Sequence, residues 1–124
     1  MIPTVLQVAF GGAIGAAARY SVGVALFRLG AGFPIGVLAV NVAGSFLMGL
    51  VVVYLGQKVL SQFTPFLMAG VLGGFTTFSA FSLEAYTLFE RGALGQAAIY
   101  VFLSVVLSIA ALIAGIFIMR GLLA

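Results

Sequence analysis

The sequence predicts an all-α membrane protein with four transmembrane helices per subunit, and three observations lead to this fold class. Of its 124 residues, 65% are hydrophobic and only 6% are charged, and the mean hydropathy is +1.38. A soluble domain of this length has too little interior to bury so much apolar surface, so the surroundings must be lipid. The charged residues also leave four charge-free stretches, 1–18, 29–57, 59–83 and 92–119. Each is close to or above the roughly 20 residues that a membrane-spanning helix needs.

Turn signals between these stretches set the expected helix ends. RLGAGFP (28–34) indicates a turn, GQKVLSQFTP (56–65) a polar break and ERGALG (90–95) a tight turn. We therefore expect a single transmembrane domain over residues 1–124, without a linker or soluble domain. Its helices are expected near residues 3–29, 34–58, 63–90 and 94–122.

The first helix contains the small-residue stretch GGAIGAAARY (11–20). Gly11, Gly15 and Ala18 form a face that suits close contact with another helix. Arg19 ends the stretch. A cation inside a membrane helix either extends toward the interface from a packing seam or attracts an anion, and the sequence leaves both interpretations open.

The second helix carries GVLAVNVAGSFLMG (36–49), with Asn41 at mid-membrane. Gly44, Ser45 and Gly49 lie on nearby turns. An intramembrane asparagine is often a hydrogen-bonding link between helices. Its amide is also a donor for an anion that has lost its water, so both roles are considered.

The third helix carries GGFTTFSAFSLE (73–84), which holds two glycines, four hydroxyls and three phenylalanines. Glycines followed by Thr76 and Thr77 weaken a helix at mid-membrane, so we expect this helix to be broken near its middle. Irregular backbone is tolerated there where protein or a cavity receives the freed groups. Freed carbonyls suit a small hard cation. Phe78 and Phe81, at i and i+3, either pack as core or present their electropositive ring edges to an anion.

The fourth helix has a line of hydroxyls at Tyr100, Ser104 and Ser108. The spacing i, i+4, i+8 keeps them within an arc of about 80° on the helix surface. Each serine hydroxyl is able to bond its own helix backbone. Three in register nevertheless favour a polar track.

The charges favour a dual-topology homodimer. One expected membrane side holds Arg28 and Arg91 and the other holds Lys58 and Arg120, so the positive-inside rule has no bias to act on. Either the short loops simply carry few charges, or copies insert both ways and pair antiparallel. Four helices in 124 residues also make a thin bundle, so a protein-lined polar path requires at least two copies.

Composition excludes several function classes. The chain has no Cys and no His, and its only acidic residues are Glu84 and Glu90. No nucleophile–base pair or metal-ligand set is available, so the protein is not expected to be an enzyme. Five scattered cations do not form a nucleic-acid-binding patch.

The motifs GGAIGAAARY, GVLAVNVAGSF and GGFTTFSAFS together resemble the Fluc/CrcB fluoride channels, in order and spacing along all four helices. This resemblance implies an antiparallel dual-topology homodimer in the cell membrane (the inner or plasma membrane), with two fluoride pores closed to chloride. It implies passive export of fluoride from the cytoplasm, which gives fluoride resistance. It also implies a structural sodium ion at the dimer centre.

The resemblance assigns site residues by position. The fluoride pore falls on Asn41, Phe78, Phe81, Ser79, Tyr100, Ser104 and Ser108. The vestibule falls on Arg19 and Glu84. The sodium ligands are the backbone carbonyls of Gly73 and Thr76.

Two other functions are compatible with a small four-helix membrane protein. A small multidrug-type dual-topology transporter, coupled to protons, needs a carboxylate deep in its first helix, and the first helix here has no acidic residue. A non-transporting packing subunit would not require Asn41 and a broken third helix together.

Overall fold

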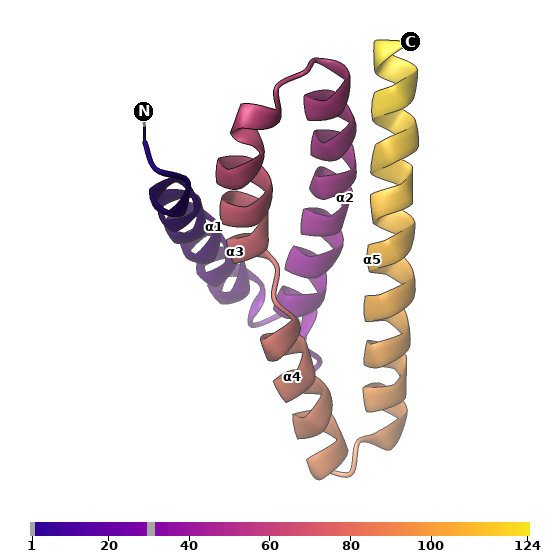
Figure 1. Cartoon of the computed structure of the whole chain (residues 1–124). Coiled ribbons are helices and arrows are strands. Elements are labelled where there is room, and N and C mark those ends of the chain that lie inside the picture. The colour runs from indigo at the N-terminus through magenta and orange to yellow at the C-terminus, as the bar shows by residue number, and fades with distance from the viewer. Residues whose placement is uncertain (1, 30–31) are drawn as a thin grey trace.

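The structure is a computed structural model that describes residues 2–29 and 32–124, and every regular element in these residues is helical (Figure 1). Four helical stretches are long and apolar enough to cross a membrane: Thr4–Leu26, Ile35–Gln57, Ser61–Glu90 and Leu94–Leu123. The predicted fold class, an all-helical protein with four spans, is confirmed at this level. The chain is a multi-pass membrane protein.

The helix bounds differ from the expected ones at several ends. The elements are α1 (Thr4–Leu26), α2 (Ile35–Gln57), the 3-10 turn η1 (Ser61–Phe63), the π-helix η2 (Pro65–Leu72), α3 (Gly73–Phe75), α4 (Phe78–Glu90) and α5 (Leu94–Leu123). α1 ends three residues before the predicted position 29. Residues 30 and 31 of the predicted turn, and residue 1, lie outside the described residues.

The helices are arranged around α2. α5 runs beside α2 along its length and approaches α4 in the lower part of Figure 1. α1 packs on the opposite side, against η2 and α3. The two chain ends both lie in the upper part of this view, as an even number of spans requires.

Glycines set the two closest helix contacts. Gly11 and Gly15 of α1 are buried against the backbone of η2, where a Cβ on Gly11 would meet the Gly70 Cα at 2.9 Å. The burial predicted for the small-residue face is confirmed for these two glycines and wrong for Ala18, which shares their helix face by spacing but is exposed in this chain. α2 and α5 meet at Gly49 and Gly115, and a Cβ on Gly49 would lie 3.1 Å from the Gly115 Cα. Backbone therefore packs on backbone at both crossings.

From η2 onward, the third span changes its backbone conformation three times. The π-helix η2 begins at Pro65, and α3 ends at Phe75. Thr76 (φ −91°, ψ 158°) and Thr77 (φ −154°, ψ 119°) are extended, and α4 begins at Phe78. The Thr77 hydroxyl accepts a hydrogen bond from the Ala80 N–H at 3.1 Å, so Thr77 is the N-cap of α4. Two extended residues thus separate two helical segments inside one span.

Candidate functional site

Asn41 of α2 binds the main chain of the extended segment. Its Nδ2 donates to the Thr77 carbonyl at 3.0 Å, and its Oδ1 accepts from the Thr77 N–H at 2.8 Å. The two bonds satisfy polar groups that an α-helix would have paired internally, and each stabilises by about 1 kcal/mol. Asn41 therefore links two helices, and one of its two amide hydrogens remains for another acceptor.

Two backbone N–H groups near the extended segment donate to side chains, and two carbonyls therefore lose the donors they would have in a regular helix. The helical donor for the Gly73 carbonyl would be the Thr77 N–H, which instead donates to Asn41. The helical donor for the Thr76 carbonyl would be the Ala80 N–H, which instead donates to the Thr77 hydroxyl. The two carbonyls predicted to bind sodium are thus two that the extended segment frees from helical pairing.

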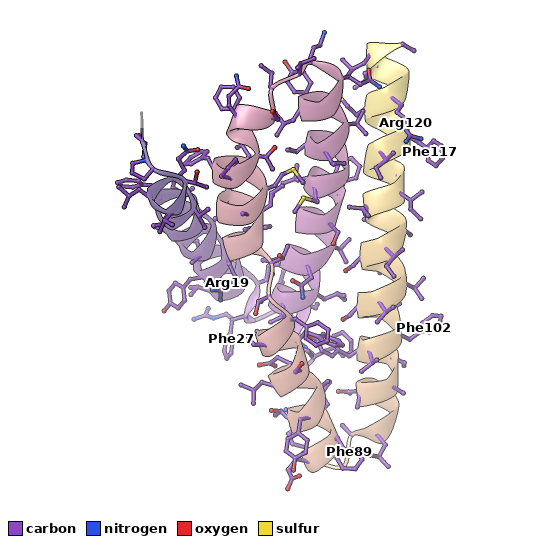
Figure 2. The ribbon with its side chains drawn as sticks, in the orientation of Figure 1. Arg19, Phe27, Phe89, Phe102, Phe117 and Arg120 are labelled. Atoms are coloured by element: carbon purple, nitrogen blue, oxygen red, sulfur yellow. The ribbon has the colours of Figure 1, made fainter. Side chains whose placement is uncertain are left out.

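A third carbonyl at this place is bonded by Arg19. The Arg19 Nε donates to the Gly74 carbonyl at 3.1 Å, from α1 to α3. The hydrogen bond is charge-assisted, and bonds of that kind are stronger than bonds between neutral groups. Arg19 is partly buried and lies between α1 and the third span in Figure 2.

A groove of about 380 Å³ runs beside the extended segment. Its walls come from α2, the 76–81 stretch and α5. Its polar lining consists of Asn41, Ser45, Thr76, Thr77, Ser104 and Ser108. Phe78 and Phe81 line it as well, so residues from three predicted motifs meet in one place.

Aromatic rings form a continuous chain at this groove. The centroids of Phe78 and Phe81 are 5.3 Å apart, with the rings inclined at 49°. Phe81 lies 5.4 Å from the ring of Tyr100, and Phe33 meets Tyr100 edge-on at 5.6 Å. Phe78 is 77% exposed, so packing within the chain does not account for it.

The hydroxyls of α5 differ from those on the outer helix surfaces. Ser21, Ser82 and Thr87 are exposed, and each donates to the carbonyl four residues earlier in its own helix. Tyr100 and Ser104 are buried, and among the described residues their hydroxyl oxygens have no hydrogen-bond partner. Buried hydroxyls of this kind are costly unless another group binds them.

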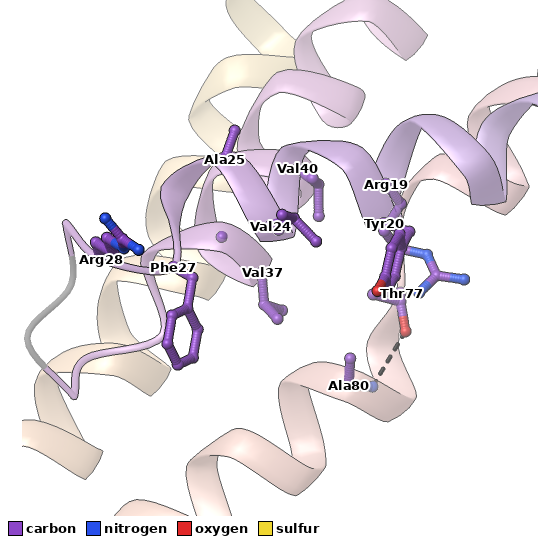
Figure 3. A pocket seen from close by; sticks show the side chains of 12 residues that line it. Arg19, Tyr20, Val24, Ala25, Phe27, Arg28, Val37, Val40, Thr77 and Ala80 are labelled. Carbon is purple, nitrogen blue, oxygen red and sulfur yellow. Dashed lines mark hydrogen bonds between the residues drawn. The ribbon is translucent and has the colours of Figure 1, made fainter.

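Two adjoining hollows lie on the other side of the extended segment. The inner hollow, of about 780 Å³, has Arg19 and Thr77 at one end and Phe27 and Arg28 at the other (Figure 3). The outer hollow, of about 670 Å³, is lined by Arg28, Arg91 and Glu84 among others. Gly23, Phe27, Arg28, Gly36 and Val37 line both hollows. Together the two hollows extend from the end of the bundle that carries Arg28 and Arg91 inward to Arg19.

The predicted site residues other than Ser79 thus lie in the groove, in the two hollows and at the extended segment. Asn41, Phe78, Phe81, Ser104 and Ser108 line the groove, and Tyr100 contacts Phe81 beside it. Arg19 and Glu84 line the inner and the outer hollow respectively. Gly73 and Thr76 lie at the extended segment. Ser79 is exposed, and its hydroxyl lies 3.2 Å from that of Thr77. Ser79 is outside the part of the chain that lines the groove.

Sequence reasoning missed two contributors to the site. Thr77 binds Asn41 and caps α4; a hydroxyl residue directly before the apolar run at Phe78 is the signal that could have indicated the cap. Phe33 packs on Tyr100 from the turn that precedes α2, and no local pattern indicates that contact.

Comparison with known proteins agrees with this geometry. The sequence model of the family described as "CrcB-like protein, Camphor Resistance (CrcB)" matches residues 6–116. The chain belongs to the CrcB family. The match includes at least part of each of the four spans and every residue that lines the groove or the two hollows.

Relatives are similar over their full length. A protein of Ruegeria sp. (strain TM1040) is 63% identical over 99% of both chains. One of Cereibacter sphaeroides (strain ATCC 17029) is 59% identical over 100% of both, and one of Paracoccus denitrificans (strain Pd 1222) is 54% identical over 98% of both. Each of the three is named "Fluoride-specific ion channel FluC".

Proposed function

We propose that this CrcB-family chain is a fluoride-selective ion channel that exports F⁻ passively from the cytoplasm and thereby gives fluoride resistance. The relative from Ruegeria sp., 63% identical over 99% of this chain, carries the name of a fluoride-specific channel. The protein acts in the cell membrane, inner or plasma, and transport involves no catalytic step.

One observation carries the proposal most strongly. The unpaired hydroxyls of Tyr100 and Ser104 lie next to the groove lined by Phe78 and Phe81. Fluoride is small and strongly hydrated, so a dry pore must replace its water with close donors. Neutral hydroxyls, an amide hydrogen and ring edges do this in series, and none carries a full charge that would trap the ion.

The open groove also supports a two-copy pore. Phe78 is 77% exposed and Gly73 is exposed, although the first is aromatic and the second destabilises a helix. Among the described residues, a Cβ on Gly73 would meet only the Met68 carbonyl, at 3.4 Å, so no contact within this part of the chain requires a glycine there. A second antiparallel copy that covers Gly73 and closes the groove would require it.

The freed carbonyls fit a structural sodium ion. Sodium prefers oxygen ligands, and carbonyls of interrupted helices supply them in membrane proteins. Gly73 and Thr76 contribute two such oxygens per chain, which is too few for one ion. Two chains related by an antiparallel axis would contribute four at the dimer centre.

The inner and outer hollows would serve as the entry vestibule. Arg19, Arg28 and Arg91 line them together with one acidic residue, Glu84. The excess of positive charge would attract anions from water toward the extended segment.

Flux from liposomes that contain only this protein tests the channel. We expect F⁻ to leave far faster than Cl⁻ without any pH gradient. α1 carries no acidic residue, so the proton-coupled transporter has no group to bind the coupling proton. Equal rates for the two halides, or fluoride efflux that requires proton exchange, would reject the proposal.

Labelling of single cysteines tests the antiparallel dimer. The chain has no natural cysteine, so Leu29→Cys and Gln57→Cys, at exposed positions next to Arg28 and Lys58, give unambiguous sites and keep the cation count of both sides. In intact cells we expect each cysteine to react with impermeant reagent from both sides of the membrane. Reaction of each from one side only would establish a fixed topology and exclude the antiparallel pair.

A further inference from the structure

Arg19 makes a contact that its assignment to the vestibule does not use. It belongs to α1, and its Nε donates to the carbonyl of Gly74, 55 residues later, at 3.1 Å. The bonding atom is the nitrogen inside the side chain, not one of the two terminal nitrogens. The terminal nitrogens therefore remain available to the inner hollow, which Arg19 lines.

Gly74 is also a residue at which α1 and α3 pack backbone against backbone. A Cβ on Gly74 would meet the Gly12 carbonyl oxygen at 2.7 Å and the Ala16 nitrogen at 3.2 Å. No side chain fits between the two backbones at this point. The absence of a side chain at Gly74 lets the two backbones approach, and the Arg19 bond adds a directional link to the Gly74 carbonyl at the same place.

The Gly74 carbonyl lies in sequence between the carbonyls of Gly73 and Thr76. Its helical donor would be the Phe78 N–H, but Phe78 begins a new helix after two extended residues. The extended segment thus frees the carbonyls of Gly73, Gly74 and Thr76 from helical pairing. Arg19 donates a hydrogen bond to one of them, the Gly74 carbonyl.

We propose that Arg19 is a positioning residue: its Nε–H holds the Gly74 carbonyl against α1, and this fixes the backbone that leads into the extended segment and carries the freed carbonyls of Gly73 and Thr76. Asn41 holds the same segment from α2, through Thr77. Two helices thereby hold the extended segment from two directions. The role in transport rests on the proposed channel function, whereas the role in holding the backbone does not.

Three substitutions separate the hydrogen bond from the charge. Arg19→Gln puts an amide nitrogen at the same position along the side chain as Nε and removes the charge. Arg19→Lys keeps a cation but has a carbon at that position. Arg19→Met has neither a donor nor a charge and keeps a similar length. Lys58→Met, an exposed cation at the end of α2, is the matched control for loss of one charge.

Hydrogen exchange of the purified protein in detergent is the first readout. We expect Arg19→Met and Arg19→Lys to raise deuterium uptake in residues 73–82 about fivefold or more, while Arg19→Gln and Lys58→Met stay within about twofold of the natural protein. Fluoride efflux is the second readout. It should follow the same order, with Arg19→Gln the most active of the three Arg19 variants.

The opposite order overturns the proposal. If Arg19→Lys keeps both protection and flux while Arg19→Gln loses them, the charge is what matters and Arg19 acts only on anions. Equal protection of residues 73–82 in all three variants also overturns it. If the natural protein releases no fluoride, the channel function fails, and hydrogen exchange still decides whether Arg19 holds the segment. If Arg19→Met does not fold, the Gln and Lys pair decides alone.

Discussion

The α2–α5 crossing and the segment from Gly73 to Thr77 are both built on glycine, yet they differ in what the glycines do. At the crossing, Gly49 and Gly115 are buried in uninterrupted helices, and each faces the backbone of the other helix. The main chain there is fully paired within α2 and α5. Because glycine has no side chain, the two helices can approach closely at this point, and the glycines have no other role there.

In the segment 73–77, two adjacent glycines have different surroundings: Gly74 packs against another helix, whereas Gly73 does not. Gly74 faces α1 at backbone distance, as at the α2–α5 crossing. Gly73 is exposed and meets only the Met68 carbonyl at 3.4 Å. Directly after them the helix gives way to two extended residues, whose main chain is bonded by Asn41.

The comparison shows how a membrane protein accommodates an interrupted helix. A close crossing of two regular helices needs only small residues, because the N–H and C=O groups of each backbone are already hydrogen-bonded within the helix. An interruption needs polar side chains from other helices, because lipid does not bond the freed groups. Arg19 and Asn41 are the polar residues inside α1 and α2 that bond this segment.

The largest effect is expected at the crossing. In Gly115→Val the new Cβ meets backbone of α2, including the Leu50 nitrogen at 3.0 Å and the Gly49 Cα at 3.2 Å. Backbone cannot rotate away, so α2 and α5 must separate, at a cost of about 3 kcal/mol in unfolding free energy. Thermal unfolding in detergent, followed by circular dichroism, measures it. Gly121→Val is the control, since a Cβ there meets nothing within 4 Å; equal stability of the two variants would contradict the role of the crossing.

A smaller and partly reversible effect is expected where α2 meets the extended segment. A Cβ on Gly44 would collide with the Thr76 methyl carbon and lie 3.2 Å from the Phe75 ring. Gly44→Ala should lower the unfolding free energy by about 2 kcal/mol. Thr76→Ser removes the methyl and keeps the hydroxyl that donates to the Leu72 carbonyl at 3.0 Å. The double variant should therefore recover about half of the loss; strict additivity of the two changes would mean that these residues do not touch.

The smallest effects distinguish the two adjacent glycines. Gly74→Ala pushes against α1 and should cost about 1.5 kcal/mol. Gly73→Ala puts its Cβ at ordinary contact distance from the Met68 carbonyl, 3.4 Å, and replaces a poor helix former, so it should raise the unfolding free energy by up to about 1 kcal/mol. A larger residue at Gly73 should instead weaken association of two copies, which size-exclusion chromatography at decreasing concentration detects. A Gly73→Leu protein that still forms dimers as tightly as the natural one would contradict the proposed contact at Gly73.

Composition and charge spacing were sufficient to predict the four spans, because lipid exposure requires long apolar helices whatever their packing. The grouping of Asn41, Phe78, Phe81 and Ser104 around one groove followed from the family motifs. The glycine and hydroxyl pattern after position 70 indicated where regular helix is least favourable, and Thr76 and Thr77 are extended there.

The bonding partners could not be predicted in the same way. Arg19 bonds Gly74, and Phe33 packs on Tyr100, because segments far apart in the sequence lie together in the fold. The local sequence around these residues does not indicate which distant segment each one meets. For Asn41 the sequence allowed a link between helices or an anion donor; the structure gives the link and leaves one amide hydrogen free. The winding of η2 likewise has no distinct sequence signal beyond Pro65 at its start.

The central claim is that fluoride passes the aromatic rings beside the extended segment, and the most direct test is the fluoride efflux of ring-deletion variants in liposomes. Phe78→Ile and Phe81→Ile keep apolar side chains but remove the electropositive ring edges. Each should reduce fluoride efflux at least about tenfold, which corresponds to roughly 1.4 kcal/mol on the barrier. Phe102→Ile is the control, since Phe102 is 64% exposed on the outer side of α5 (Figure 2), and it should conduct like the natural protein. Folded Phe78→Ile and Phe81→Ile proteins that both release fluoride at the natural rate would contradict the account.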